Sequence, residues 1–424
     1  MLLNSCRYFD VDFCSMKFDP EKRKVMLLYS AGFNSLSYYL KSDIKELMDG
    51  YLPGNAVNDD IVLVYSHHTG NTGKYSVQTE PSLVRLYKSD GKVVADTLVK
   101  YPVGTISSSA VQLNKVLEQV RTSYPAGSYG MVFSSHATGY LPVGYYAAPD
   151  VYEGKESIPF GLSRGSSFPE YDSASPVRYV EPKYDPSLPM VKSIGQDVVI
   201  MEGVDYSYEM DIIDFAGAIP MYLDYILFDA CLMGGVEVAC ELKDVCGLVG
   251  FSQAEVLAEG FDYSMLTTYL LGGEEPDPVK VCESYFKRYD AMSGVNRSAT
   301  ISVFDCSRID ALVDVCGTLF DKYNEVISVI DPSLVQQYYR YDYHWFYDLE
   351  SILLAAGVSD EEMAAFRSAM EECMIYKAAT PSFMNAFEIK VFSGLSMFLP
   401  SNGGAFLKNY YKGLEWNKLT GLLR

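Results

Sequence analysis

The sequence lacks any long hydrophobic run, and its apolar stretches fall well short of the roughly 20 residues that a membrane-spanning helix requires. It also lacks Cys-x-x-Cys pairs, and its nine cysteines follow no regular spacing. Neither a zinc cluster nor a small disulfide scaffold is therefore indicated. No segment is of low complexity and 49% of the residues are apolar, which excludes a disordered chain and predicts a folded globular protein.

Positive charge is scarce as well, because 34 Lys and Arg residues face 55 Asp and Glu residues for a net charge of −21. This balance argues against nucleic acid and anionic membranes as partners. It suits a cationic substrate, although an acidic surface also serves solubility alone. No signal peptide is recognisable, but "LLNSC" at 2–6 resembles the end of a lipoprotein cleavage box. Cys6 is thus a candidate lipid anchor, and an arbitrary N-terminus explains the segment equally well.

Hydrophobic patterning predicts strands that alternate with helices. Short apolar runs predict buried strands at 24–32, 60–66, 129–136, 224–230 and 247–253. Apolar residues at helical spacing predict helices at 35–50, 107–127, 209–219 and 234–244, and a strand followed by a long helix across 299–327. Asp90-Gly91 predicts a hairpin, and 386–403 is typical of a late strand. This alternation predicts an α/β fold with a largely parallel sheet and helices on both faces.

The chain is long for one hydrophobic core, so a large domain with an appended subdomain is expected. We expect an N-terminal leader or linker at 1–23, a main α/β domain at 24–295, and a mostly helical subdomain at 296–424 that completes the fold. Residues 140–200 are rich in proline, glycine, serine and tyrosine without sustained periodicity. They predict a long irregular loop, which in a compact domain is usually functional or disordered.

Two chemically competent residues follow predicted strands. His136 ends the strand at 129–136, and Cys231 follows the strand at 224–230. Ligands of such sheets bind beyond the carboxyl ends of the strands, so neighbouring strands would bring imidazole and thiol together. Cys231 is also predicted at a helix N-terminus, which favours the thiolate. A thiolate paired with a histidine is a nucleophile for acyl transfer, and the backbone N–H groups of Ala137 and Cys231 would form an oxyanion hole.

These segments resemble a known family. "FDACLMGGVEVACEL" looks like the nucleophile motif of the clostripain-like cysteine peptidases, relatives of caspases, gingipains and legumains, and "SSHATGYLPV" resembles their His-Gly-x-Gly motif. The resemblance runs from about residue 24 to the end of the chain. It implies a caspase-like three-layer sandwich, a Cys–His dyad acting on peptide or protein substrates, and an extracytoplasmic location. It implies no required cofactor, with calcium left open because some relatives depend on it. The chain departs from the family at Ala137, where glycine is usual.

The resemblance also implies cleavage after Arg or Lys, which requires a carboxylate in a partly desolvated pocket. Asp229 matches the family position that lines this S1 pocket. A second acid would come from the loop after 247–253, where three residues qualify: Glu255, Glu259 and Asp262. Each of these is equally an ordinary solvated loop acid.

Relatives are often zymogens cut between the catalytic histidine and cysteine. The proline-rich interval here suits proteolysis, and we expect self-cleavage after Lys155 or Arg164. The alternative is an ordered insertion that never opens. A different functional class also stays open, because Ala137 is compatible with a catalytically silent domain that binds peptides or glycopeptides at a cell surface.

The other candidates have simpler interpretations. His67 and His68 also follow a strand but lead into a polar segment where surface histidines are ordinary. His344 lies in an aromatic patch that indicates packing. An α/β-hydrolase lacks its Gly-x-Ser-x-Gly elbow here. Core positions are expected for the remaining C-terminal cysteines: Cys240, Cys246, Cys282, Cys306, Cys316 and Cys373.

Overall fold

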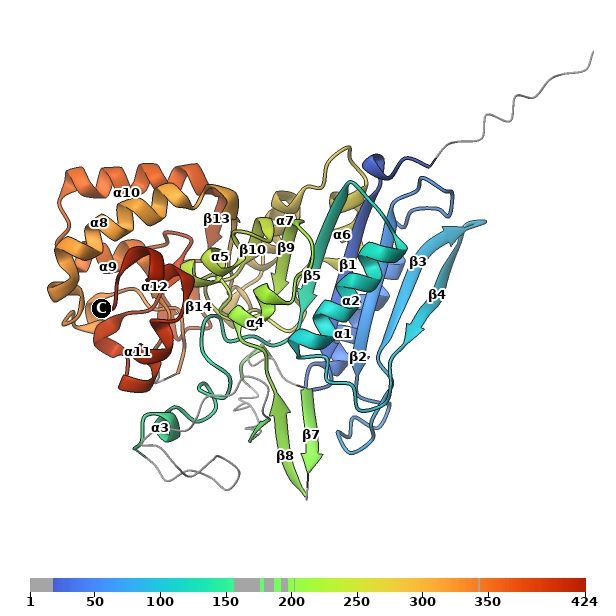
Figure 1. Ribbon diagram of the computed structural model, residues 1–424, viewed down its shortest axis with the longest axis horizontal. Helices are drawn as coiled ribbons and strands as arrows, with labels where there is room; N and C mark the ends of the chain where they lie inside the picture. Colours follow the sequence, from blue (N-terminus) through green and yellow to red (C-terminus); the bar gives the residue numbers. More distant parts are fainter. Residues whose placement is uncertain (1–17, 156–175, 179–186, 192–196, 202, 342–343) are drawn as a thin grey trace, which may run out of the picture.

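A nine-stranded mixed sheet forms the centre of the molecule (Figure 1). The computed structural model describes residues 18–155, 176–178, 187–191, 197–201, 203–341 and 344–424. The strand order is β13-β11-β10-β9-β5-β1-β2-β3-β4. The bounds are β1 Lys24–Gly32, β2 Ile61–His68, β3 Ser82–Ser89, β4 Lys92–Lys100, β5 Ser128–Ser134, β9 Leu223–Asp229, β10 Cys246–Phe251, β11 Thr300–Asp305 and β13 Met374–Ala379.

The middle of this sheet is parallel and its edges are antiparallel. Strands β2, β1, β5, β9 and β10 run parallel, whereas β3 and β4 on one side and β11 and β13 on the other run antiparallel to their neighbours. Every residue of β1 is buried, as expected for a parallel strand that is covered on both faces. The predicted hairpin is also confirmed, since Asp90 and Gly91 both have positive φ between β3 and β4.

Helices cover both faces of the sheet, which confirms the predicted α/β class. One set of packed helices is α2 Ala110–Ser123, α4 Ile212–Gly217 and α5 Val236–Leu242, and it lies in front of the sheet in Figure 1. The other set is α1 Ser37–Asp49, α6 Tyr263–Leu271 and α7 Pro278–Asp290. Helix α2 begins at Ala110, inside the predicted range of 107–127, and the side chain of its N-cap residue Ser109 accepts from the backbone N–H of Gln112. Among the described residues, no helix is long and apolar enough to cross a membrane.

The C-terminal part adds both strands and helices. Its strands β11 and β13 extend the central sheet, so it completes the same fold. Its helices are α8 Asp310–Ile327, α9 Leu349–Ala355, α10 Asp360–Cys373, α11 Ala405–Tyr411 and α12 Glu415–Thr420. The late strand predicted at 386–403 is reduced to short pieces, which pair as β12 Tyr347–Asp348 with β16 Ser396–Met397, and β14 Ser382–Phe383 with β15 Phe387–Glu388.

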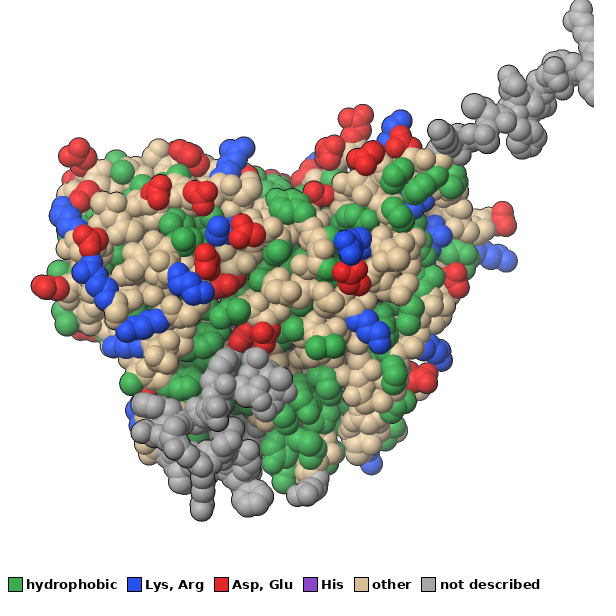
Figure 2. All heavy atoms as spheres, viewed as in Figure 1, with side chains coloured by type: hydrophobic (Ala, Val, Ile, Leu, Met, Phe, Trp, Pro, Cys, Tyr) green, Lys and Arg blue, Asp and Glu red, His purple; other side chains and the backbone are tan. Residues whose placement is uncertain are grey.

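The interval between His136 and Cys231 contains regular structure that the sequence did not predict. Its described part includes helix α3 Pro149–Tyr152 and a three-stranded sheet of β6 Val177–Arg178, β8 Val204–Tyr208 and β7 Asp197–Met201. The β7–β8 hairpin projects away from the central sheet (Figure 1). Figure 2 shows hydrophobic side chains gathered on this hairpin, where Ile200, Met201 and Val204 are exposed. Elsewhere on that face, acidic and basic side chains are interspersed.

Candidate active site

His136 and Cys231 lie beyond the carboxyl ends of two adjacent parallel strands. Strand β5 pairs with β9, and the last pair in their register is Ser134 with Asp229. Each candidate residue lies two positions beyond that pair, so both belong to the same edge of the sheet. Both are buried, His136 with 4% of its surface exposed and Cys231 with none. The topology therefore brings the two sequence-predicted residues to one place.

Cys231 lies in a turn rather than at a helix N-terminus, so that prediction is wrong. Helix α5 begins only at Val236, after the N-cap residue Gly235. The residue after the cysteine, Leu232, has a φ of 62°, a left-handed conformation that costs a non-glycine residue free energy and is found at functional sites. The backbone N–H of Val256 donates to Cys231 Sγ at 3.0 Å. This N–H group can stabilise a thiolate without a helix terminus.

The loop of His136 is held from two sides. Ser35, in the segment after β1, places its Oγ 3.2 Å from Nε2 of His136. Gly139 has a φ of 60°, and a Cβ atom there would collide with the carbonyl oxygen of Leu232. Glycine is therefore required at Gly139, two residues beyond the position that usually carries glycine in the family. Ala137 itself is half-buried and is not among the residues with positive φ, so an alanine fits there without backbone strain.

Asp229 is buried beneath this edge of the sheet, on the side of α6. Its Oδ2 accepts hydrogen bonds from Tyr263 Oη at 2.5 Å and from Ser134 Oγ at 3.1 Å. Gly260 packs directly on the carboxylate, because a Cβ atom there would overlap both of its oxygens. Burial raises the pKa of the Tyr285 hydroxyl well above its ordinary value, and the nearby Asp229 and Cys231 add to this effect.

The three other candidate acids have different surroundings. Glu255 is buried and forms an ion pair with Arg340, with Nε and Oε2 2.7 Å apart. Glu259 is exposed. Asp262 is half-buried and accepts from Ser264 Oγ at 2.6 Å. Arg340 comes from the C-terminal part of the chain. No local pattern predicts this ion pair, because 85 residues separate its partners.

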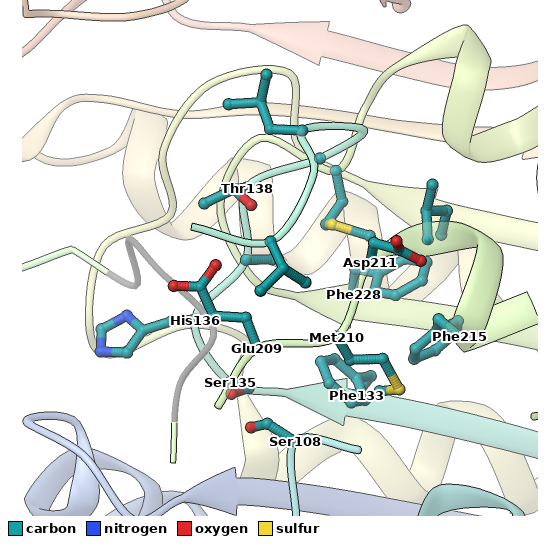
Figure 3. A pocket seen from close by; sticks show the side chains of 16 residues that line it. Ser108, Phe133, Ser135, His136, Thr138, Glu209, Met210, Asp211, Phe215 and Phe228 are labelled. Atoms are coloured by element: carbon teal, nitrogen blue, oxygen red, sulfur yellow. The ribbon is translucent and has the colours of Figure 1, made fainter. Parts of the chain in front are cut away.

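A small pocket borders the His136 loop on the side of α4. Figure 3 shows the His136 imidazole directed away from the aromatic side chains of Phe133, Phe215 and Phe228 in this pocket. Glu209 also lines it and accepts from the backbone N–H of Gly144 at 2.8 Å. The pocket therefore lies behind the histidine loop, on the opposite side of the sheet from Asp229.

The remaining histidines are structural, and the interpretation of His67 and His68 as surface residues is wrong. His67 is buried, stacks on Phe33 with ring centroids 4.7 Å apart, and lies 2.8 Å through Nδ1 from Ser107 Oγ. His68 Nε2 lies 2.9 Å from Ser30 Oγ, and burial lowers the pKa of this imidazole to about 3, assisted by the charge of Lys41. His68 is therefore neutral at physiological pH.

In the described part of the chain, the cysteines other than Cys231 are core residues, as the sequence predicted. None of the seven cysteines in the described part of the chain forms a disulfide. Burial raises the pKa of Cys240 and of Cys373 to about 12, which keeps these thiols protonated and unreactive. In the same part of the chain, no group of three or more His, Cys, Asp or Glu side chains is arranged to hold a metal ion.

Comparisons with known proteins show the family and the fold that this chain shares. The model of a family described as the clostripain family, Peptidase_C11, matches residues 28–150 and 183–420. Among solved structures, an inactive zymogen C11 protease from Parabacteroides distasonis is 26% identical, with a TM-score of 0.71 over 94% of this chain and 98% of that one. A secreted C11 cysteine protease from Bacteroides thetaiotaomicron, in complex with an irreversible peptide inhibitor, shares the fold at 22% identity, with a TM-score of 0.69 over 94% and 98% of the two chains. No curated protein matches the chain.

Proposed function

This chain belongs to the clostripain family of cysteine peptidases, and from that premise we propose that it cleaves peptide bonds after Arg or Lys with a dyad of Cys231 and His136. The observation that carries the proposal is the placement of both residues two positions beyond the last pair of β5 and β9. The substrate is a peptide or protein, which agrees with the peptide inhibitor bound to the Bacteroides relative.

In the proposed reaction, the Cys231 thiolate attacks the carbonyl carbon of the scissile bond and forms a tetrahedral oxyanion. The backbone N–H groups of Ala137 and Cys231 donate to that oxyanion. His136 then gives its proton to the leaving amine as the C–N bond breaks, which leaves a thioester on Cys231. Water deprotonated by His136 hydrolyses the thioester, releases the carboxylate product and restores the thiol. Ser35 contacts the ring of His136 and acts as a positioning residue.

Asp229 is the proposed partner of the substrate cation in the S1 pocket. Its carboxylate lies on the same side of the sheet as Tyr263, and its strand leads directly to Cys231. We propose Glu255 as the second acid that attracts the positive charge of the substrate side chain. Its ion pair with Arg340 links it to the C-terminal part of the chain. Glu259 and Asp262 remain candidates for the rim of the pocket, where an exposed acid contributes less binding free energy than a buried one.

Burial of the site supports a zymogen state for the intact chain. Neither Cys231 nor Asp229 has exposed surface, so a substrate must displace covering residues before it reaches them. We propose that the chain activates itself by cleavage after Lys155 or Arg164. Lys155 is exposed and follows α3, where its Nζ lies 3.3 Å from Asp150 Oδ1. Arg164 lies outside the described residues.

The alternative function is a silent peptide- or glycopeptide-binding domain, which the replacement of glycine by Ala137 favours. The unstrained backbone of Ala137 weakens that argument. Labelling with an irreversible thiol-directed peptidyl inhibitor ending in lysine tests the two functions. The proposed peptidase becomes labelled at Cys231 and loses labelling in Cys231→Ala, whereas a silent domain labels at background rate in both proteins.

We propose an extracytoplasmic location, with Cys6 as a candidate lipid anchor; Cys6 lies outside the described residues. The location rests on family membership and on the relative described as secreted. For calcium, the described residues offer no cluster of metal-binding side chains, and we derive no step through a metal. Peptidase activity that is unchanged by a chelator supports this mechanism, and activity restored only by calcium contradicts it.

A further inference from the structure

A short piece of the interval between His136 and Cys231 lies beside the loop that follows β10. Val191 forms an antiparallel bridge with Leu257. The backbone N–H of Ala258 donates to the carbonyl oxygen of Met190 at 2.9 Å. Val191 is buried, with 8% of its surface exposed. Met190 and Val191 therefore pair with this loop in an antiparallel direction, as an extended peptide pairs with the edge of a strand.

The register of this pairing shows which loop residue would face the next residue of a bound peptide. In an antiparallel pair, one chain advances by one residue as the other retreats by one. Met190 is bonded to Ala258, and Val191 lies opposite Leu257. A substrate residue that continued this pairing would therefore lie opposite Val256. Val256 is the residue whose N–H group donates to Cys231 Sγ at 3.0 Å. The pairing thus directs that substrate residue toward the thiol.

We infer, on the basis of the proposed function, that residues 188–191 occupy the groove for the acyl side of a substrate, and that substrates bind there in the same register. The scissile bond then follows the position opposite Val256. The substrate residue before the scissile bond is P1. Val191 then occupies the position of the P2 residue, and Met190 occupies the position of the P3 residue. In the sequence, Val191 is followed by Lys192, which lies outside the described residues and has the side-chain type proposed for the S1 pocket.

The surroundings of the two side chains define the substrate class. Val191 packs into the main hydrophobic core cluster. Met190 packs on a separate small cluster that includes Leu36, Leu40 and Ala258. Both positions are apolar, so a charged residue would lose its hydration there without gaining a partner. The preferred substrates are therefore peptides with a basic P1 residue, a β-branched aliphatic residue at P2 and an unbranched apolar residue at P3.

Peptide kinetics test this preference. Wild type is given Leu-Pro-Met-Val-Lys followed by a common leaving segment, the same peptide with Asp in place of Val or of Met, and a control with the Asp in the leaving segment. We expect kcat/KM to fall at least tenfold for Asp in either acyl-side position and to change less than threefold for the control. Equal cleavage of all four peptides overturns the inference and leaves the proposed function intact. If wild type cleaves no peptide faster than Cys231→Ala does, the proposed function is wrong, and the inference that rests on it is wrong as well.

Labelling of the freshly purified single chain tests the occupancy of the groove. Val191→Asp should release the strand, and we expect Cys231 to react with a lysine-ended peptidyl inhibitor at least tenfold faster than in wild type. Ile200→Asp, on the exposed end of β7, is the matched control and should react at the wild-type rate. Val191→Ser, a milder change, provides the comparison if the Tm of Val191→Asp falls. Wild-type labelling rates in both Val191 variants would overturn the inference.

Discussion

Ser35 Oγ lies 3.2 Å from Nε2 of His136, although 101 residues separate them in the chain. The contact joins the segment after β1 to the loop after β5, two adjacent strands of the sheet. A hydroxyl at this distance limits the rotation of the imidazole and makes Ser35 a positioning residue of the proposed dyad.

Removing this hydroxyl should slow catalysis without preventing binding. One neutral hydrogen bond contributes about 1 kcal/mol, so Ser35→Ala should lower kcat roughly fivefold and leave KM nearly unchanged. The pH profile of kcat/KM should shift along its histidine limb, which a purely structural role would not cause. Ser35→Thr keeps the hydroxyl and is the control. A rise in KM at constant kcat would show that Ser35 acts on substrate binding instead.

Asp229 should control the preference for basic residues. Asp229→Asn keeps the size of the side chain but removes its charge, and kcat/KM on Lys and Arg peptides should fall by about 100-fold or more, since a buried cation would lose its partner. The loss should be far smaller for Asp262→Asn at the half-buried rim. Thermal unfolding of each variant checks that the fold is intact. A peptide library that reveals preference for small apolar or acidic residues before the scissile bond would contradict this role.

Glu237 should make the stability of the protein depend on pH. Burial raises the pKa of this carboxyl to about 7, although it accepts hydrogen bonds from the Phe398 backbone N–H at 2.8 Å and from Tyr411 Oη at 2.7 Å. Because the folded pKa lies above the unfolded one, the stabilisation is complete below the unfolded pKa and is lost as pH rises through about 7.

Glu237→Gln imitates the protonated carboxyl. Between pH 5 and pH 8, wild type should therefore lose about 2 kcal/mol of unfolding free energy that the variant keeps. Urea unfolding at both pH values measures this difference. Glu371→Gln, on the exposed face of α10, is the control and should follow wild type. Parallel pH dependence in wild type and Glu237→Gln would show that another group is responsible.

Self-processing should depend on the chain's own thiol. Incubated wild type should be cut after Lys155 or Arg164 into two chains that stay associated, because β7 beyond the cuts remains bonded to the core: the backbone N–H of Val198 donates to the Phe33 carbonyl at 3.0 Å. Gels and N-terminal sequencing identify the cut, with Cys231→Ala incubated in parallel. An intact wild type would make the interval a stable insertion. Cleavage of both proteins would indicate another protease.

The α/β class and the two central residues followed from local patterns. Buried parallel strands are continuous apolar runs, and the alternation with helices fixes a largely parallel sheet. His136 and Cys231 are both strand-terminal, so their meeting required only that β5 and β9 be neighbours, as they are. The family resemblance then indicated the catalytic and substrate-binding roles of these residues, which hydrophobic patterns alone do not indicate.

The surroundings of those residues depend on contacts that no local pattern contains. Ser35 and Arg340 reach the site from other parts of the chain. The early start predicted for α5 failed because Gly234 lies against the backbone of Gln253, where a Cβ atom would collide, and the chain stays extended there. The β7–β8 hairpin was missed because its strands are short and bordered by proline-rich sequence, so period-2 alternation is not sustained long enough to be recognised.

Cleavage of a peptide library by wild type and Cys231→Ala, measured side by side, tests the central claim most directly. Cys240→Ala, which removes a buried thiol nine positions further along the chain, is the matched control. We predict cleavage after Lys and Arg by wild type and by Cys240→Ala, and none by Cys231→Ala. Peptidase activity that persists in Cys231→Ala would contradict the account, because the thiol at the end of β9 would not be the nucleophile.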